Sequence, residues 1–155
     1  MKKRGFLLVL LCWMTALLPL QAQNTVLGER VPEVRSEHWL NQVQPAAAPM
    51  TVILFFTAAT PSGARALTHL HDLAEQLDGR LRVIAVTRDD AGQAASVAAD
   101  LLSPRLTVAF DSEGRLFRNF GVNYVPFSLL VNERNRLLWQ GNPLQLTEKL
   151  ISTAQ

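Results

Sequence analysis

A buried strand that runs directly into a helix start constrains the fold of this chain more than any other stretch. Residues 51–56, TVILFF, form a short apolar run rich in β-branched and aromatic side chains. Such a run predicts a strand buried on both faces, because a half-exposed strand would alternate polar and apolar residues. Thr60 and Pro61 then supply a helix N-cap and a favoured first helical residue. The free N–H groups and positive dipole end of a helix are therefore expected just beyond a central strand.

The rest of the chain alternates predicted strands and helices. Apolar periodicity predicts that Leu146 and Leu150 share the inward face of a C-terminal helix. Gly79 is expected as a left-handed helix cap, and Asn135 as a positive-φ residue in a tight turn at 132–135. This order predicts one α/β domain with strands in both directions. The expected strands are 51–56, 81–87, 106–110, 127–131 and 136–140, and the expected helical segments are 62–78, 91–102, 116–120 and 144–153.

The first 22 residues have the features of a secretory signal peptide. Basic residues at 2–4 precede an apolar run at 6–18, and Ala22 offers a small residue for cleavage. We expect cleavage after Ala22, which predicts a periplasmic or secreted protein. Residues 23–48 would then form an N-terminal extension and 49–155 the main domain. An uncleaved leader acting as a membrane anchor is the alternative, and a membrane association is expected only in that case.

Removal of the leader changes the charge and the cysteine content. The whole chain has 15 basic and 13 acidic residues and a net charge of +2. Three of the basic residues lie at 2–4, so the mature chain keeps 12 basic and 13 acidic residues, a net charge of −1. No nucleic-acid partner is therefore implied. The one cysteine, Cys12, also lies in the leader, so the mature chain can form no disulfide.

The order of the elements and the residues at their junctions resemble the thioredoxin fold, and more narrowly the periplasmic TlpA/ResA-type thioredoxin-like proteins. The resemblance runs from about Gly28 to the C-terminus. Residues 55–58, FFTA, match the strand that enters the active site, and residues 125–131, VPFSLLV, match the segment with the family's cis-proline, here Pro126. Residues 88–104 lie where this subfamily inserts a helix between the two halves. The resemblance implies a central mixed β-sheet flanked by helices.

The redox centre of that family is missing from this sequence. Its Cys-x-x-Cys motif would fall on Thr60, Pro61, Ser62 and Gly63, and Ala59 stands where a bulky aromatic usually precedes the first cysteine. Thiol–disulfide exchange requires a thiolate, and a hydroxyl cannot replace it. We therefore expect no intrinsic oxidoreductase activity, no catalytic residue and no cofactor.

Other chemistry at this helix start has little support in the sequence. Capping the helix is the expected role of Thr60, because nucleophilic catalysis by its hydroxyl or that of Ser62 would need a nearby base. His69 and His71 are two residues apart, so they lie on different helix faces, and we expect both to be solvated. His38 lies in the extension, and the spacing of the three histidines predicts no metal site.

A binding surface is the function that remains. If the Val125–Pro126 bond is cis, the resemblance implies that the neighbouring backbone can pair with an extended peptide. The alternative is a purely architectural Pro126. The aromatic-rich set Leu116, Phe117, Phe120 and Tyr124 is expected to be core rather than surface. The predicted groove consists of Ala59, Thr60, Pro61, Tyr124, Val125 and Pro126.

Three hypotheses about function follow. The leading one is a secreted, redox-inactive module, accessory or chaperone-like, that binds an exported protein or an extended peptide segment. The second is a non-exchanging component of thiol–disulfide metabolism that holds a thiol-bearing partner or glutathione. The third is a purely structural role, in which replacing Tyr124 or Pro61 leaves every association intact.

Overall fold

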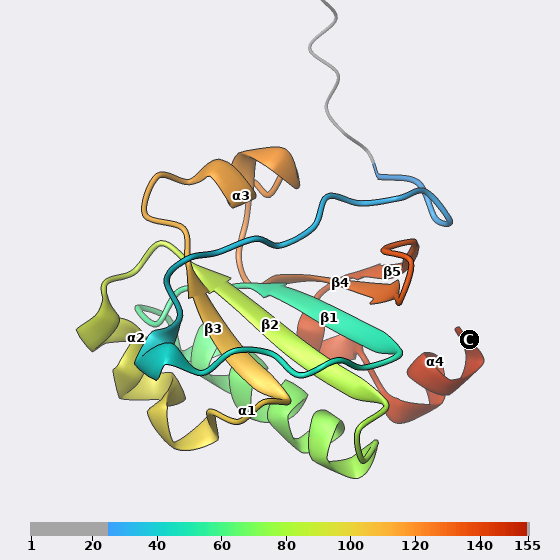
Figure 1. Ribbon diagram of the computed structural model, residues 1–155, viewed down its shortest axis with the longest axis horizontal. Coiled ribbons are helices and arrows are strands. Elements are labelled where there is room, and N and C mark those ends of the chain that lie inside the picture. The colour runs from blue at the N-terminus through green and yellow to red at the C-terminus, as the bar shows by residue number, and fades with distance from the viewer. Residues whose placement is uncertain (1–24, 155) are drawn as a thin grey trace, which may run out of the picture.

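A computed structural model describes residues 25–154 (Figure 1). The predicted leader, with Cys12, lies outside the described residues. Five strands form one mixed sheet in the order β3–β2–β1–β4–β5. The central strand β1 (Met50–Phe55) pairs in parallel with β2 (Leu81–Thr87) and antiparallel with β4 (Phe127–Asn132). The edge strands are β3 (Leu106–Phe110), parallel to β2, and β5 (Leu137–Gly141), antiparallel to β4.

Helices cover both faces of the sheet and connect its strands. The α-helices are α1 (Pro61–Gln76), α2 (Ala91–Ala98), α3 (Arg115–Asn119) and α4 (Glu148–Thr153). Three short 3-10 helices are η1 (Leu40–Gln42), η2 (Ala99–Leu101) and η3 (Pro143–Gln145). In Figure 1, α1 lies behind the sheet, whereas the N-terminal segment crosses in front of it. The structure confirms a mixed sheet flanked by helices, with α2 between β2 and β3 where an inserted helix was predicted.

Every residue of β1 is buried, as the apolar run predicted. Val52 and Leu54 face a core that includes Leu67 and Leu70 of α1. Phe55 faces a second core on the other side of the sheet, built with α3 and the N-terminal segment. Burial of a large apolar side chain stabilises a fold by about 1.5–3 kcal/mol. The connection from β1 to α1 therefore starts from a fully buried strand at the centre of the sheet.

The segment before β1 runs from one edge of the sheet to the other (Figure 1). At the β5 edge, the Gly28 N–H donates to the Leu137 carbonyl at 2.8 Å. At the β3 edge, the Phe110 N–H donates to the His38 carbonyl at 3.0 Å. Leu40 is 3% exposed and belongs to the core on the α1 side. The N-terminal extension is therefore packed along the sheet and against both of its cores.

The C-terminal helix is shorter than the predicted 144–153. Thr147 has an extended backbone and its side chain accepts a hydrogen bond from the Leu150 N–H at 3.2 Å, so it caps a helix that begins one residue later. Leu146 is buried but precedes the helix, and Ile151 rather than Leu150 is its fully buried residue. A threonine N-cap requires non-helical dihedral angles, which is why the helix cannot extend through position 147.

The two predicted left-handed positions are confirmed. Gly79 follows α1 with φ 80°, and Asn135 has φ 56° in the turn between β4 and β5. The helix predicted over 91–102 is divided, because α2 ends at Ala98 and the chain tightens into η2. Across residues 25–154, none of the helices is both long enough and apolar enough to cross a bilayer.

Candidate functional site

Three connections leave the sheet at the same end. Phe55, the last residue of β1, is paired with Phe127, the first residue of β4. Ser128 of β4 is paired with Gly141, the last residue of β5. The β1–α1 loop, the segment that enters β4 and the chain that follows β5 therefore meet at one end of the sheet. The predicted groove residues belong to the first two of these connections.

The start of α1 is capped as the sequence predicted. Thr60 has an extended backbone, with φ −118° and ψ 143°, and its Oγ1 accepts a hydrogen bond from the Gly63 N–H at 3.3 Å. The Ser62 hydroxyl donates to the same Oγ1 at 3.2 Å. Pro61 occupies the first helical position. The Thr60 hydroxyl thus serves the helix end, which is the role expected of an N-cap.

Asp89, in the loop that follows β2, ties the β1–α1 connection to the end of β2. Its carboxylate accepts hydrogen bonds from the Thr57 hydroxyl at 3.0 Å, the Ala58 N–H at 2.6 Å and the Thr87 hydroxyl at 2.9 Å. Hydrogen bonds to a charged acceptor are stronger than those between neutral groups. In the sequence, the only sign of this role is an aspartate two residues after Thr87, the last residue of β2. That pattern is common in turns, and it does not indicate a partner 32 residues away in the chain.

The Val125–Pro126 peptide bond is cis. Tyr124, just before it, is 62% exposed, and its ring packs edge-on against the ring of Phe127. Tyr124 is therefore on the surface, where the groove prediction placed it, and the broader expectation of a core position is wrong for this residue. That expectation is confirmed for its three companions, Leu116, Phe117 and Phe120, which are buried.

Of the other predicted groove residues, Ala59 and Pro61 are exposed, whereas Thr60, Val125 and Pro126 are partly buried. The groove prediction therefore contains exposed apolar surface on both the β1–α1 loop and the segment entering β4. A groove between these two segments stays a prediction.

The two helical histidines are not freely solvated, and that expectation is wrong. His69 Nε2 lies 2.7 Å from the Leu146 carbonyl oxygen, and since a carbonyl can only accept, this nitrogen carries the proton. His71 Nδ1 is buried without a hydrogen-bond partner among the described residues. The His69 contact follows from the packing of α1 against the C-terminal segment, which the pattern of a single helix does not reveal. Within residues 25–154, no group of three or more His, Cys, Asp or Glu side chains could hold a metal ion.

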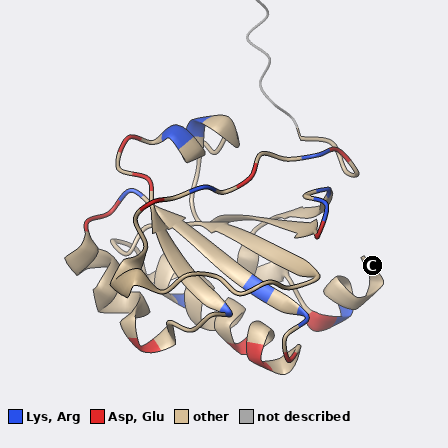
Figure 2. Ribbon diagram, in the orientation of Figure 1, with Lys and Arg blue, Asp and Glu red and all other residues tan. Residues whose placement is uncertain are grey.

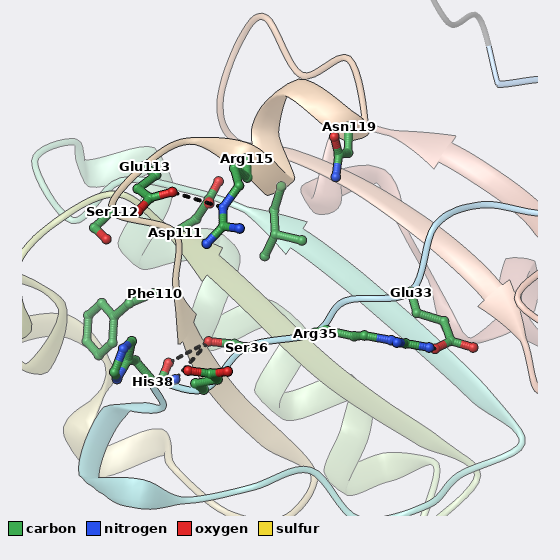
Figure 3. Close-up of a pocket in the computed structure, with 12 residues that line it drawn as sticks. Glu33, Arg35, Ser36, His38, Phe110, Asp111, Ser112, Glu113, Arg115 and Asn119 are labelled. Atoms are coloured by element: carbon green, nitrogen blue, oxygen red, sulfur yellow. Dashed lines mark hydrogen bonds and ion pairs between the residues drawn. The ribbon is translucent and has the colours of Figure 1, made fainter.

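A polar pocket of about 500 Å³ lies between the N-terminal segment and the β3–α3 connection (Figure 3). Its charged side chains are paired locally: Arg35 with Glu33 at 2.8 Å, and Arg115 with Glu113 at 3.0 Å. The buried Asp111 accepts a hydrogen bond from the Phe117 N–H at 3.0 Å. The lining has four acidic side chains and two arginines, so the pocket keeps an excess of negative charge. Its two walls are about 70 residues apart in the chain, so no local sequence pattern predicts this pocket.

Charges of both signs are spread over the connections and helices, as Figure 2 shows. Arg82 is an exception within the sheet: its Nε donates to the Thr51 hydroxyl and its Nη1 to the Ala46 carbonyl, both at 2.8 Å. Partial burial lowers the pKa of Arg82 from its ordinary value. These bonds tie the loop before β1 to the sheet, so the role of Arg82 is structural.

No protein-family model and no curated protein matches the sequence. Solved structures do match the fold. A thioredoxin-like protein solved in its oxidised form has a TM-score of 0.66 at 21% identity, over 81% of this chain and 94% of that chain. A thioredoxin-like protein from Aeropyrum pernix has a TM-score of 0.59 at 16% identity, over 74% of this chain and 79% of that one.

The same fold occurs in a secreted disulfide oxidoreductase of Mycobacterium tuberculosis, homologous to Escherichia coli DsbE. It has a TM-score of 0.53 at 15% identity, over 74% of this chain and 81% of that one. At these identities the likeness establishes the fold alone. This chain has the thioredoxin-like fold, as its motifs implied, and because it has a single cysteine it contains no Cys-x-x-Cys motif.

Proposed function

We propose that this thioredoxin-like protein binds an extended segment of another exported protein and does not itself exchange disulfides. The observation that carries the proposal is Tyr124, a large aromatic side chain that is 62% exposed at the sheet end where the β1–α1 loop begins. Exposed aromatic rings at a fixed position are favoured anchors of protein interfaces.

Small and apolar residues beside Tyr124 support the same proposal. Ala59 and Pro61 are exposed on the β1–α1 loop, and Val125 and Pro126 are partly exposed on the segment entering β4. An extended peptide could pair with the backbone of this segment and place alternate side chains against the apolar surface. The binding would be noncovalent, because Thr60 offers a hydroxyl where a redox protein of this fold would offer a thiol.

Export is part of the proposal. The predicted leader supports a periplasmic or secreted protein, and the Mycobacterium tuberculosis structure of the same fold is described as secreted. The partner would then be another exported protein that presents an extended segment.

Site-specific photo-crosslinking in the native host tests the proposal. A benzophenone amino acid is placed at Tyr124, and in a matched strain at Leu27. Leu27 is similarly exposed, at 65%, and lies at the opposite end of β5, where the neighbouring Gly28 bonds to Leu137. We expect one exported protein to be linked at position 124 within a single extended segment, and not at position 27. Equal labelling at the two positions, or none at 124, would contradict the proposal.

A second candidate keeps the protein in thiol–disulfide metabolism as a non-exchanging component. The Thr60 Oγ1 accepts hydrogen bonds from both Gly63 and Ser62, so its own proton is available to a thiolate held at the helix start. This candidate predicts that glutathione binds, and that added protein changes the rate of disulfide reduction by a separate thioredoxin. This candidate is contradicted if calorimetry detects no binding of glutathione and if a stoichiometric amount of the protein leaves the rate of disulfide reduction unchanged.

A further inference from the structure

Backbone atoms fill the space in front of Gly63. A Cβ added at this residue would overlap the Thr57 carbonyl oxygen and lie 3.1 Å from the Thr57 carbonyl carbon. It would also lie 3.4 Å from the Thr60 Oγ1. The overlapping atom belongs to the backbone, so it cannot rotate away as the end of a long side chain could. Position 63 is therefore closed to every residue except glycine unless the β1–α1 loop moves.

The β1–α1 loop, which blocks the space beside Gly63, is hydrogen-bonded to Asp89. The Asp89 carboxylate accepts from the Thr57 hydroxyl at 3.0 Å and from the Ala58 N–H at 2.6 Å. It is itself fixed to β2 through the Thr87 hydroxyl at 2.9 Å. Thr57 therefore has both roles: its carbonyl blocks position 63, and its hydroxyl is bound by Asp89.

We infer that Asp89 is a positioning residue, which holds the β1–α1 loop in a conformation that excludes any side chain at position 63. This helix start is consequently closed to a dithiol: restoring the two missing cysteines does not restore a redox centre. The inference goes beyond the proposed binding function, because it concerns the covalent chemistry that this site can carry. It is independent of whether a partner binds beside Tyr124.

The steric claim is tested first, by a matched pair of glycine substitutions. Gly63 and Gly92 both lie in the first turn of a helix, but a Cβ at Gly92 would meet only the Asp90 carboxylate, at 3.3 Å. In urea unfolding of the full chain, we expect Gly63→Ala to lower the midpoint and Gly92→Ala to leave it unchanged or raise it. Failure of Gly63→Ala to fold while Gly92→Ala folds is the same result in a stronger form. A Gly63→Ala protein as stable as the wild type overturns the inference.

The role of Asp89 is tested by a double-mutant cycle. Asp89→Ala releases the loop, so the loss caused by Gly63→Ala is expected to be smaller in the Asp89→Ala protein than in the wild type. Asp90→Ala is the control, because Asp90 caps α2 by accepting from the Gln93 N–H at 2.8 Å and its own bonds lie within that helix start. In the Asp90→Ala protein the loss should be unchanged. Equal losses in all three backgrounds would show that Asp89 does not hold the loop.

The chemical consequence is tested with Thr60→Cys/Gly63→Cys. A disulfide between the two new thiols would form by exchange with oxidised glutathione, which accepts two electrons and two protons and leaves as two glutathione molecules. After such treatment, we expect positions 60 and 63 to be found alkylated or separately glutathionylated by peptide mass spectrometry. A stoichiometric 60–63 disulfide in a protein that unfolds at the wild-type urea midpoint would overturn the inference. The disulfide measurement involves no partner protein, so its result is independent of the crosslinking test of the proposed function.

Discussion

The ring of Tyr124 lies edge-on to the ring of Phe127, with 5.4 Å between the centroids and 72° between the planes. Phe127 is the first residue of β4 and pairs with Phe55 at the end of the central strand. The exposed ring is thus packed against a residue that pairs with the central, buried strand. A side chain already held in one position loses less conformational entropy on binding, which favours Tyr124 as the anchor of an interface.

Replacing Tyr124 with alanine should separate binding from stability. Because the side chain is mostly exposed, we expect a stability loss of about 0.5–1.5 kcal/mol, the range for an aromatic pair. Association with the crosslinked partner should weaken at least about tenfold, as for an interface hot spot. Leu27→Ala is the matched control and should leave association unchanged. Wild-type affinity in the Tyr124→Ala protein would support the purely structural role instead.

Thr60→Ala tests the assignment of Thr60 as a helix cap. Loss of the bond from the Gly63 N–H to the Thr60 Oγ1 should destabilise the protein by about 1 kcal/mol. Thr60→Ser keeps a hydroxyl in reach of the same N–H and should retain most of the stability. Urea unfolding of the two variants provides the measurement. If both variants were equally destabilised, the methyl group rather than the hydrogen bond would carry the effect.

Much of the fold could be predicted because its signals are local. The β1 run is apolar from Val52 to Phe55, and its β-branched and aromatic residues favour a strand that faces two cores. Thr60 with Pro61 marked the start of α1, and Gly79 and Asn135 marked two turns through their conformational freedom. Each of these features depends only on residues close together in the chain, so it can be predicted from a single sequence.

The features that were not predicted depend on contacts between distant residues. Asp89 binds a loop 31–32 residues away, and His69 meets a carbonyl 77 residues away. No local pattern encodes either partner. The exposure of Tyr124 could not be predicted for a related reason. An aromatic residue four positions after Phe120 is expected in the core unless the path of the chain into β4 is known.

Glu33 offers a test of the surface electrostatics. A hydrogen bond and the charge of Arg35 lower the pKa of the Glu33 carboxyl from its ordinary value. A lowered carboxyl pKa stabilises the folded state above the ordinary pKa, and that contribution is lost as the pH falls through the lowered value. Since the Glu33 carboxylate lies at the surface, where solvent screens it, we expect no measurable change in stability. An NMR titration should instead give a lower midpoint for Glu33 in the wild type than in Arg35→Gln; identical midpoints would show that the pair is absent in solution.

The contact between His69 and Leu146 predicts how the C-terminal segment is held. His69 Nε2 is 2.7 Å from the Leu146 carbonyl, which lies between η3 and α4. His69→Ala leaves this carbonyl without its side-chain donor, so we expect a stability loss of about 1 kcal/mol and faster amide exchange across 143–151.

Thr68→Ala is the control for His69→Ala. The Thr68 hydroxyl is exposed and donates to the Ala64 carbonyl within α1, so its loss should not affect exchange in the C-terminal segment. Hydrogen–deuterium exchange by mass spectrometry resolves both effects in one experiment. Faster exchange at 143–151 in His69→Ala alone would show that this hydrogen bond attaches the C-terminal segment to α1. Unchanged exchange in both variants would assign that attachment to the buried side chains of Leu146 and Ile151, which pack in the same core as α1.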